Sequence, residues 1–599
     1  MPRLLCLPVL LFFLWLPSQL AAAEVTKQPD KVSIDFLYIN ANAGEAAGGH
    51  TALRLGDAVF HYQFFPDSTF LLVREPWDSF RFLYNDLHNR SIAIAALPLD
   101  LSAAIQIRNH FAELLAAQEQ FFNALEQLRQ EKRFVESLLA GKTDVAVDCL
   151  GFFTNTWRAV SPSDLPRYIE KTLGADFLEF TLKEVEGELY KAVAAMNQGR
   201  RPGNGFQEIL ALREALRVLL DNRALTDDAL IPAMDKEVSL NVSEREILKA
   251  FGDHLAESLV ELLRSRRPDR GTAILLQTAR FLAVQSSLEK GQMLTLDPFF
   301  ADVREVKLSD EDIEGGRLRI LQEGLLEQSE KRRELFFKEG RHLEIAYTLM
   351  ETGRARAWEL EQVNGGQRRV RLLTKVTLPT RSGNVTVDTL HPDPDGVKEN
   401  IQILEEEIAE KQKKSEKLYG YNLFTRNCAT ELIRSLNSTF TDSESGKNVL
   451  GGWMEPDSGF AFIPFLFYEQ SVKAFSLQDE QFLQARRLRN LETLYAEEND
   501  LVVWLRESNT VSSTLYQPRS KDTPFLFFTD DSLLLRPLLG LVNVAYGIAH
   551  GVAGLAMLPL DGRENLNQAL RGIFYSLPEL TFGNIRKGSY SMGESENRL

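Results

Sequence analysis

The strongest constraint on the fold of this chain is a long helical block that separates two regions of strand-like sequence. Residues 32–64 contain runs of β-branched and aromatic side chains, and similar runs return at 367–378 and 384–390. Between them, residues 101–366 mostly carry apolar side chains at three- and four-residue spacing, the pattern of amphipathic helices. We therefore expect an α+β protein whose small antiparallel sheet is interrupted by a large helical insertion.

The start of the chain predicts secretion. A positive charge precedes the apolar run at 4–16, and the small residues at 21–23 resemble a signal-peptidase cleavage site. Cleavage would remove Cys6 and leave a mature chain with two cysteines, Cys149 and Cys428. We expect a periplasmic protein, in a compartment that permits disulfides.

The charge of the chain limits its partners. The formal net charge is −16 at pH 7, and cleavage after residue 23 would make it −17 because Arg3 is the only charged residue removed. Such a chain is repelled by polyanions, so we expect no nucleic-acid partner and no attraction to a generally anionic membrane.

Residues 48–65, GGHTALRLGDAVFHYQFF, predict a tight β-hairpin. Two strand-like runs flank Gly56 and Asp57, a pair suited to a two-residue turn that needs positive φ. In a hairpin centred on that pair, His50 and His61 fall near one end, and we expect them on one face. A lone strand histidine is most often structural, whereas two histidines brought together suggest a site.

A second candidate element is Asn427-Cys428, which follows a long charged helix expected at 401–417. The next residues resume helical spacing, so Cys428 is expected at a helix N-terminus. There the unpaired main-chain N–H groups and the helix dipole favour the thiolate, which is the nucleophilic form of cysteine. The alternative is a small apolar residue that only packs the start of the helix.

In this order the two elements resemble the permuted papain-like enzymes, the NlpC-type and lecithin:retinol-acyltransferase-like superfamily. YNLFTRNCAT after a helix, with GGHTALRL far upstream, is similar to the periplasmic domain of the Lnb-type lipoprotein N-acyltransferases. The resemblance implies a permuted papain-like (NlpC-like) catalytic core. The gap between His61 and Cys428 is longer than in compact members, which fits the helical insertion.

The resemblance also implies roles for four residues. Cys428 would be the nucleophile, His50 the general base, and His61 the group that orients the base. Main-chain N–H groups at the start of the Cys428 helix, together with the Asn427 side chain, would stabilise the oxyanion. Thiolate chemistry needs no metal, and we expect no metal or other cofactor.

On this interpretation the chain divides into five parts. They are a signal peptide at 1–23, the first part of the catalytic core with the histidine hairpin at 24–100, the helical insertion at 101–366, the second part of the core with the Asn-Cys helix at 367–475, and a C-terminal helical region at 476–599.

The C-terminal region contains the longest apolar segment of the mature chain, at 532–560. Its glycines allow close helix packing, but Arg536 and His550 make it less apolar than most spanning helices. We favour a buried or membrane-surface hairpin over a true span, with peripheral membrane contact through this segment. Residues 478–498 are also predicted to be helical.

Three functions remain open at this point. The first is a periplasmic cysteine acyltransferase or thiol hydrolase that forms an S-acyl intermediate on Cys428 and acts on lipid-derived or lipoprotein acyl groups. The second is a cysteine amidase or peptidase on cell-wall peptides. The third is a non-enzymatic envelope scaffold stabilised by a disulfide between Cys149 and Cys428.

Overall fold

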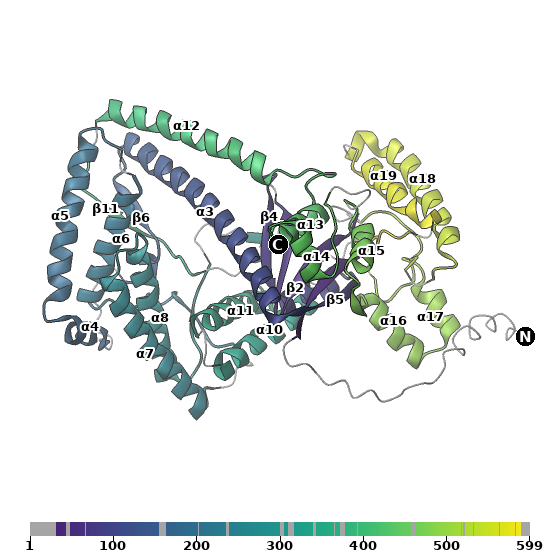
Figure 1. The fold of residues 1–599 in the computed structure, drawn as a ribbon, viewed down its shortest axis with the longest axis horizontal. Helices are drawn as coiled ribbons and strands as arrows, with labels where there is room; N and C mark the ends of the chain where they lie inside the picture. Colours follow the sequence, from purple (N-terminus) through teal and green to yellow (C-terminus); the bar gives the residue numbers. More distant parts are fainter. Residues whose placement is uncertain are drawn as a thin grey trace, which may run out of the picture.

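The computed structural model describes residues 31–588, apart from 43–47, 66, 155–162, 202, 235–238, 300–304, 309–316, 340–342, 365, 372–377, 392, 457–461, 517, 519–521, 531, 562 and 582. The predicted signal peptide lies outside the described residues. So does half of the strand expected at 367–378, namely residues 372–377. The protein has the expected α+β architecture: its described residues form one six-stranded antiparallel sheet, three two-stranded sheets and many helices (Figure 1).

The main sheet has six strands in the order β12-β5-β1-β2-β3-β4, and every neighbouring pair is antiparallel. The strands are β1 (Lys31–Ile39), β2 (His50–Leu55), β3 (Ala58–Phe64), β4 (Phe70–Pro76), β5 (Ile92–Asp100) and β12 (Gln478–Leu483). The β2–β3 hairpin is confirmed: Ala52 pairs with His61, and Gly56 in the turn has φ of +63°.

Helices cover both faces of the main sheet. On one face, Leu53 and Phe60 pack against α13 (Cys428–Asn437), α15 (Pro464–Ala474) and the first turns of α3 (Leu101–Leu139). The opposite face carries a smaller cluster that includes the short helix α2 (Trp77–Arg81) and the π-helical turn η1 (Phe82–Leu87).

The strands predicted after the insertion do not return to this sheet. β10 (Arg369–Arg371) pairs with β9 (Glu305–Lys307), and β11 (Gly383–Thr386) pairs with β6 (Asp144–Val147), in separate two-stranded sheets. The strand that does return is β12, within the segment 478–498 that the sequence predicted to be helical. That prediction is wrong up to residue 485: residues 478–483 form β12, a polar, exposed edge strand held by main-chain pairing to β5, and the helix begins only at residue 486.

The helical insertion forms a separate lobe with its own apolar core (Figure 1). Its entry and exit helices, α3 and α12 (Pro394–Tyr419), run side by side from the sheet to this lobe. Among the residues that the structure describes, the other helices of the insertion are α4 (Leu165–Leu173), α5 (Phe177–Asn197), α6 (Gly203–Leu220), α7 (Val242–Arg264), α8 (Arg270–Lys290), α10 (Arg317–Glu339) and α11 (Leu343–Asn364).

Beyond the sheet, the C-terminal region contains α16 (Arg486–Glu497), α17 (Asp500–Glu507), the long α18 (Arg536–Asp561) and α19 (Glu564–Ser576). α18 and α19 pack as a hairpin. The α18 glycines permit this: a Cβ at Gly554 would lie 2.9 Å from the Leu566 main-chain nitrogen, and one at Gly547 would lie 2.9 Å from an Ile573 side-chain carbon. The expected close helix packing is thus confirmed.

Candidate functional site

Asn427 fixes the position of Cys428 at the start of α13. The Asn427 side-chain oxygen accepts hydrogen bonds from the main-chain nitrogens of Ala429 and Thr430, both at 3.0 Å. In return, the Thr430 hydroxyl accepts from the Asn427 main-chain nitrogen at 2.9 Å, which completes a capping box. Cys428 is therefore the first residue of the helix, as the sequence predicts.

The other end of the Asn427 amide ties together two loops beside the site. Its Nδ2 donates to the main-chain oxygens of Leu423 at 2.7 Å and Phe462 at 2.8 Å. Both amide hydrogens are thus in use, and none is left for an oxyanion in this geometry. Asn427 instead positions Cys428, so the expected role of its side chain as an oxyanion donor does not fit this geometry.

The Cys428 sulfur lies at the N-terminal end of β2, beside Thr51. The main-chain N–H and the hydroxyl of Thr51 lie near the sulfur, together with the N–H groups of Cys428 and Ala429. The Thr51 hydroxyl is buried and has no other hydrogen-bond partner among the described residues. The β2–β3 ladder ends at Ala52, one residue short of Thr51, which leaves the Thr51 N–H available on that side.

Burial decides the protonation of this cysteine. It raises the pKa of the Cys428 thiol, and the N–H groups and the Thr51 hydroxyl only partly offset that effect. The sequence-based expectation that a helix N-terminus would favour the thiolate is therefore outweighed by desolvation. At neutral pH the Cys428 side chain is therefore a thiol, and a base would be needed to convert it to the thiolate.

The structure brings the two predicted histidines together. His50 Nε2 lies 3.0 Å from His61 Nδ1, with the two rings nearly perpendicular. If His50 donates through Nε2, its Nδ1 is unprotonated and can accept a proton. Burial, together with neighbouring His61 and Arg90, holds the pKa of His50 well below its usual value, so the imidazole is neutral at pH 7.

Glu75 extends this pair and was not identified from the sequence. His61 is fully buried, and its Nε2 lies 3.7 Å from Glu75 Oε2 on β4. Neither atom has a hydrogen-bond partner among the described residues. Only the strand register could have pointed to Glu75, because β4 places Val73 opposite His61 and Glu75 two residues further on the same face.

His50 and His61 lie on the face of the sheet opposite α13. The histidines and α13 are both close to the N-terminal end of β2, where His50 is the first residue of the strand and Thr51, the second, lies beside Cys428. Residues that pair across strands share a face, so His50 and His61 share a face with Ala52, whereas Thr51 faces α13. Tyr84 lies beside both His50 and Cys428. Its ring stacks on the His50 ring with 5.7 Å between centroids. Burial raises the pKa of Tyr84, and the nearby Cys428 raises it further.

Arg90 supplies a positive charge beside the sulfur. Its guanidinium lies 5.4 Å from the centre of the Tyr84 ring, and it donates to the main-chain oxygens of Asn40 at 2.6 Å and Ile39 at 3.3 Å. Burial lowers the pKa of Arg90 to about 10, and neighbouring Tyr84, Tyr38 and Cys428 act in the opposite direction. The guanidinium therefore remains charged at neutral pH and favours negative charge on Cys428.

The helical insertion supports the face that carries the histidines. Arg332 of α10 donates to the Ser79 hydroxyl at 2.6 Å, and that hydroxyl donates to Gln328 at 3.3 Å. Burial lowers the pKa of Arg356, on α11, to about 10. Arg356 lies close enough to Glu75 for the carboxylate to offset part of this lowering. The insertion therefore holds α2 against the sheet and places a cation near Glu75.

Three exposed aromatic or aliphatic side chains precede Cys428 in the chain, those of Tyr421, Leu423 and Phe424, and we call them the rim residues. Burial raises the pKa of Tyr421, and the nearby Cys428 sulfur raises it further. The Tyr421 ring contacts Phe64 and Phe70. Phe424 packs edge-on against Phe462 at 5.2 Å yet remains 62% exposed. The segment just before Cys428 therefore exposes three large aromatic or aliphatic side chains.

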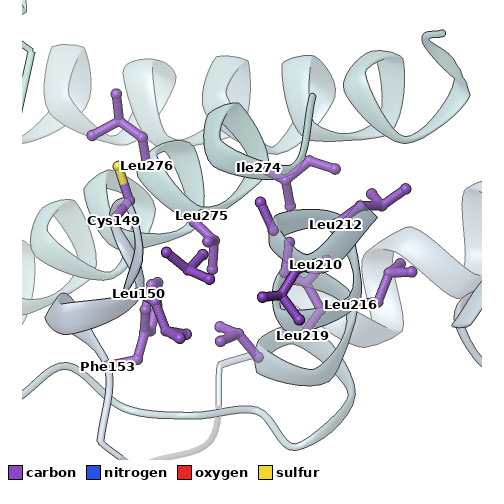
Figure 2. Close-up of a cluster of buried hydrophobic side chains, with 14 of the residues drawn as sticks. Cys149, Leu150, Phe153, Leu210, Leu212, Leu216, Leu219, Ile274, Leu275 and Leu276 are labelled. Carbon is purple, nitrogen blue, oxygen red and sulfur yellow. The ribbon is translucent and has the colours of Figure 1, made fainter. Parts of the chain in front are cut away.

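The second cysteine is separate from this site. Cys149 is buried in the core of the helical lobe among leucines of α6 and α8 (Figure 2). Its thiol donates to the main-chain oxygen of Pro379 at 3.4 Å, and burial raises its pKa. Both cysteines are free in this structure, so the Cys149–Cys428 disulfide of the scaffold alternative is not formed.

No group of three or more histidine, cysteine, aspartate or glutamate side chains that could hold a metal ion occurs within the part of the chain that the structure describes.

Comparison with known proteins found no matching family model, no similar curated protein and no similar solved structure.

Proposed function

We propose that this chain is a periplasmic cysteine acyltransferase or thiol hydrolase with a permuted papain-like core, related to the Lnb-type enzymes. One observation carries the proposal. A capped cysteine at a helix N-terminus lies against Thr51, the residue that follows His50, and His50 is hydrogen-bonded to His61 at 3.0 Å. In this proposal Cys428 is the nucleophile, His50 the base and His61 the group that orients the base.

In the proposed reaction, His50 Nδ1 accepts the Cys428 proton and the thiolate attacks the carbonyl carbon of an acyl donor. The main-chain N–H groups of Cys428 and Thr51, with the Thr51 hydroxyl, stabilise the resulting oxyanion. The intermediate then collapses: the bond to the leaving group breaks, and the His50 imidazolium gives that group its proton. The product is an S-acyl enzyme.

The second half of the reaction restores the enzyme. An amine, a hydroxyl or water gives its proton to His50 and attacks the S-acyl carbonyl carbon. The carbon–sulfur bond breaks, and the thiolate takes the proton back from His50. His61 keeps Nδ1 of His50 unprotonated at the start of each half, and Glu75 stabilises positive charge that develops on the two imidazoles.

The surroundings of Cys428 favour a lipid-derived acyl donor over a cell-wall peptide. A peptide substrate needs hydrogen-bonding partners for its amides, whereas the exposed rim residues Tyr421, Leu423 and Phe424 offer chiefly apolar and aromatic surface. Long acyl chains gain free energy from such a surface by leaving water.

The test is to trap the acyl-enzyme. Purified mature protein is mixed with medium- and long-chain thioesters and esters, and peptides are mapped by mass spectrometry. We expect one acyl adduct on Cys428 in wild type and in the control variant Cys149→Ala. The adduct should be lost in Cys428→Ala and strongly reduced in His50→Ala.

Two results would contradict this proposal. Absence of any adduct on Cys428 with every acyl donor would exclude S-acyl chemistry on these substrates. Cleavage of muropeptide amides by wild type, with no reaction towards acyl esters, would replace the lipid proposal with the amidase alternative.

A further inference from the structure

The α18–α19 hairpin carries a broad apolar surface that nothing in the described structure covers. We call this the hairpin surface and define it by side chains that are each more than half exposed: Leu538, Leu541, Ile548, Val552 and Leu555 of α18 and Phe574 of α19. Soluble proteins seldom leave so continuous an apolar face in water unless it binds something.

The composition of α18 separates it from an ordinary surface helix. The most apolar 18-residue window within residues 536–558 has a mean hydropathy of 1.6, yet only 22% of that window is buried. No Asp, Glu, Lys or Arg occurs between residues 537 and 558. The polar Asn543 points inward, where its side-chain oxygen accepts from Leu526 and Phe527. The outward face is therefore apolar along nearly its whole length.

We propose that the hairpin surface docks this protein onto a lipid bilayer with the two helices lying in the membrane interface. A protein partner would normally require a polar rim and several hydrogen bonds, and the exposed face of α18 offers almost none. The partner should be a lipid of no net charge, because the strongly negative chain is repelled by an anionic surface.

The tip of the hairpin argues against a span. Arg563 and Glu564, at the turn between α18 and α19, are exposed charges that a spanning α18 would carry across the hydrocarbon. α19 has 13 residues, which at about 1.5 Å per residue is too short to cross a core of about 30 Å. An interfacial hairpin leaves the tip in water and immerses only the apolar face.

The hairpin is firmly joined to the candidate site. Tyr575 and Ile585 pack on Ala41, two residues after the end of β1. Arg586 forms a β-bridge with Asn42 and donates to the main-chain oxygen of Asn89, the neighbour of Arg90. Docking through the hairpin surface would therefore hold the surroundings of Cys428 at the bilayer. The docking proposal is argued from the apolar hairpin surface alone and does not depend on the proposed chemistry at Cys428.

The test is flotation of the full mature protein with phosphatidylcholine vesicles at low and high salt. We expect wild type to float with the vesicles equally at both salt concentrations. The double variant L541E/V552E should bind at least tenfold more weakly. The matched control F180E/Y190E, which changes two comparably exposed apolar residues on α5, should bind as wild type does. Circular dichroism checks that each variant is folded.

Three results would overturn the docking proposal. They are no binding of wild type to these vesicles, equal binding by the L541E/V552E variant, and a stable dimer in solution that L541E/V552E converts to monomer. The last would show that a second copy of this chain covers the surface. Cys428→Ala should still bind vesicles, so a failure of docking and a failure of the proposed chemistry can be told apart.

Discussion

Replacing Asn427 by alanine should destabilise α13 by about 3 kcal/mol. The alanine removes the helix cap on Ala429 and Thr430, a loss of about 1 kcal/mol. It also removes the two hydrogen bonds from Nδ2 to Leu423 and Phe462, each contributing about 1 kcal/mol. Since about 1.4 kcal/mol is a factor of ten, the sum corresponds to about 150-fold.

Hydrogen exchange read by mass spectrometry measures this effect in the intact protein. Amides in α13 should exchange about 150-fold faster in Asn427→Ala than in wild type. Asn437→Ala is the matched control, because Asn437 lies at the other end of α13 and makes one hydrogen bond, to the Met454 main-chain oxygen at 2.9 Å. Its expected effect is about 1 kcal/mol, or about fivefold.

Asn427→Asp should exchange at least as fast as Asn427→Ala, because its buried carboxylate would face the main-chain oxygens of Leu423 and Phe462 in place of the amide donor. If exchange in Asn427→Ala rises no more than in Asn437→Ala, the assignment of Asn427 as the residue that organises the start of α13 is wrong.

Two further predictions concern the thiols and the glycines. An ordinary thiol of pKa about 8.5 is about 3% thiolate at pH 7. Burial raises the pKa of Cys428, so its alkylation by iodoacetamide should be slower at pH 7 than that of a free thiol. The alkylation rate should reach its midpoint above about pH 8.5. A midpoint below that pH would refute the argument that burial dominates the pKa of Cys428. Cys149 should react only on unfolding. In thermal melts, Gly554→Ala should destabilise the hairpin because its Cβ meets the α19 main chain at 2.9 Å, whereas Gly551→Ala, whose nearest contact is 3.5 Å, should be neutral or stabilising; equal effects would refute the packing argument.

Local sequence was sufficient to predict the β2–β3 hairpin and the start of α13. A Gly-Asp turn sets the register of its own strands, and an Asn cap acts on amides two and three residues away. Both signals operate within a few residues, so they can be read without knowing the rest of the fold. The same holds for the convergence of His50 and His61, which follows from the hairpin register alone.

The position of β12 shows where this approach fails. Main-chain pairing to β5 holds that strand, and its side chains are mostly exposed, so no pattern of apolar residues marks it. The predicted return of the sheet near residue 370 failed for a related reason. β10 and β11 are short strands, and whether they join the main sheet or pair with strands of the insertion depends on where the insertion folds.

The sequence by itself determined the α+β class, the helical insertion, the histidine hairpin and the capped cysteine, because each follows from contacts between residues close in the chain. Only the tertiary structure decided that Thr51, Glu75, Tyr84 and Arg90 surround the site. It also decided that burial raises the pKa of Cys428 and that α18 keeps its apolar face exposed. These properties depend on which distant segments exclude water from a given side chain, and no local pattern records that.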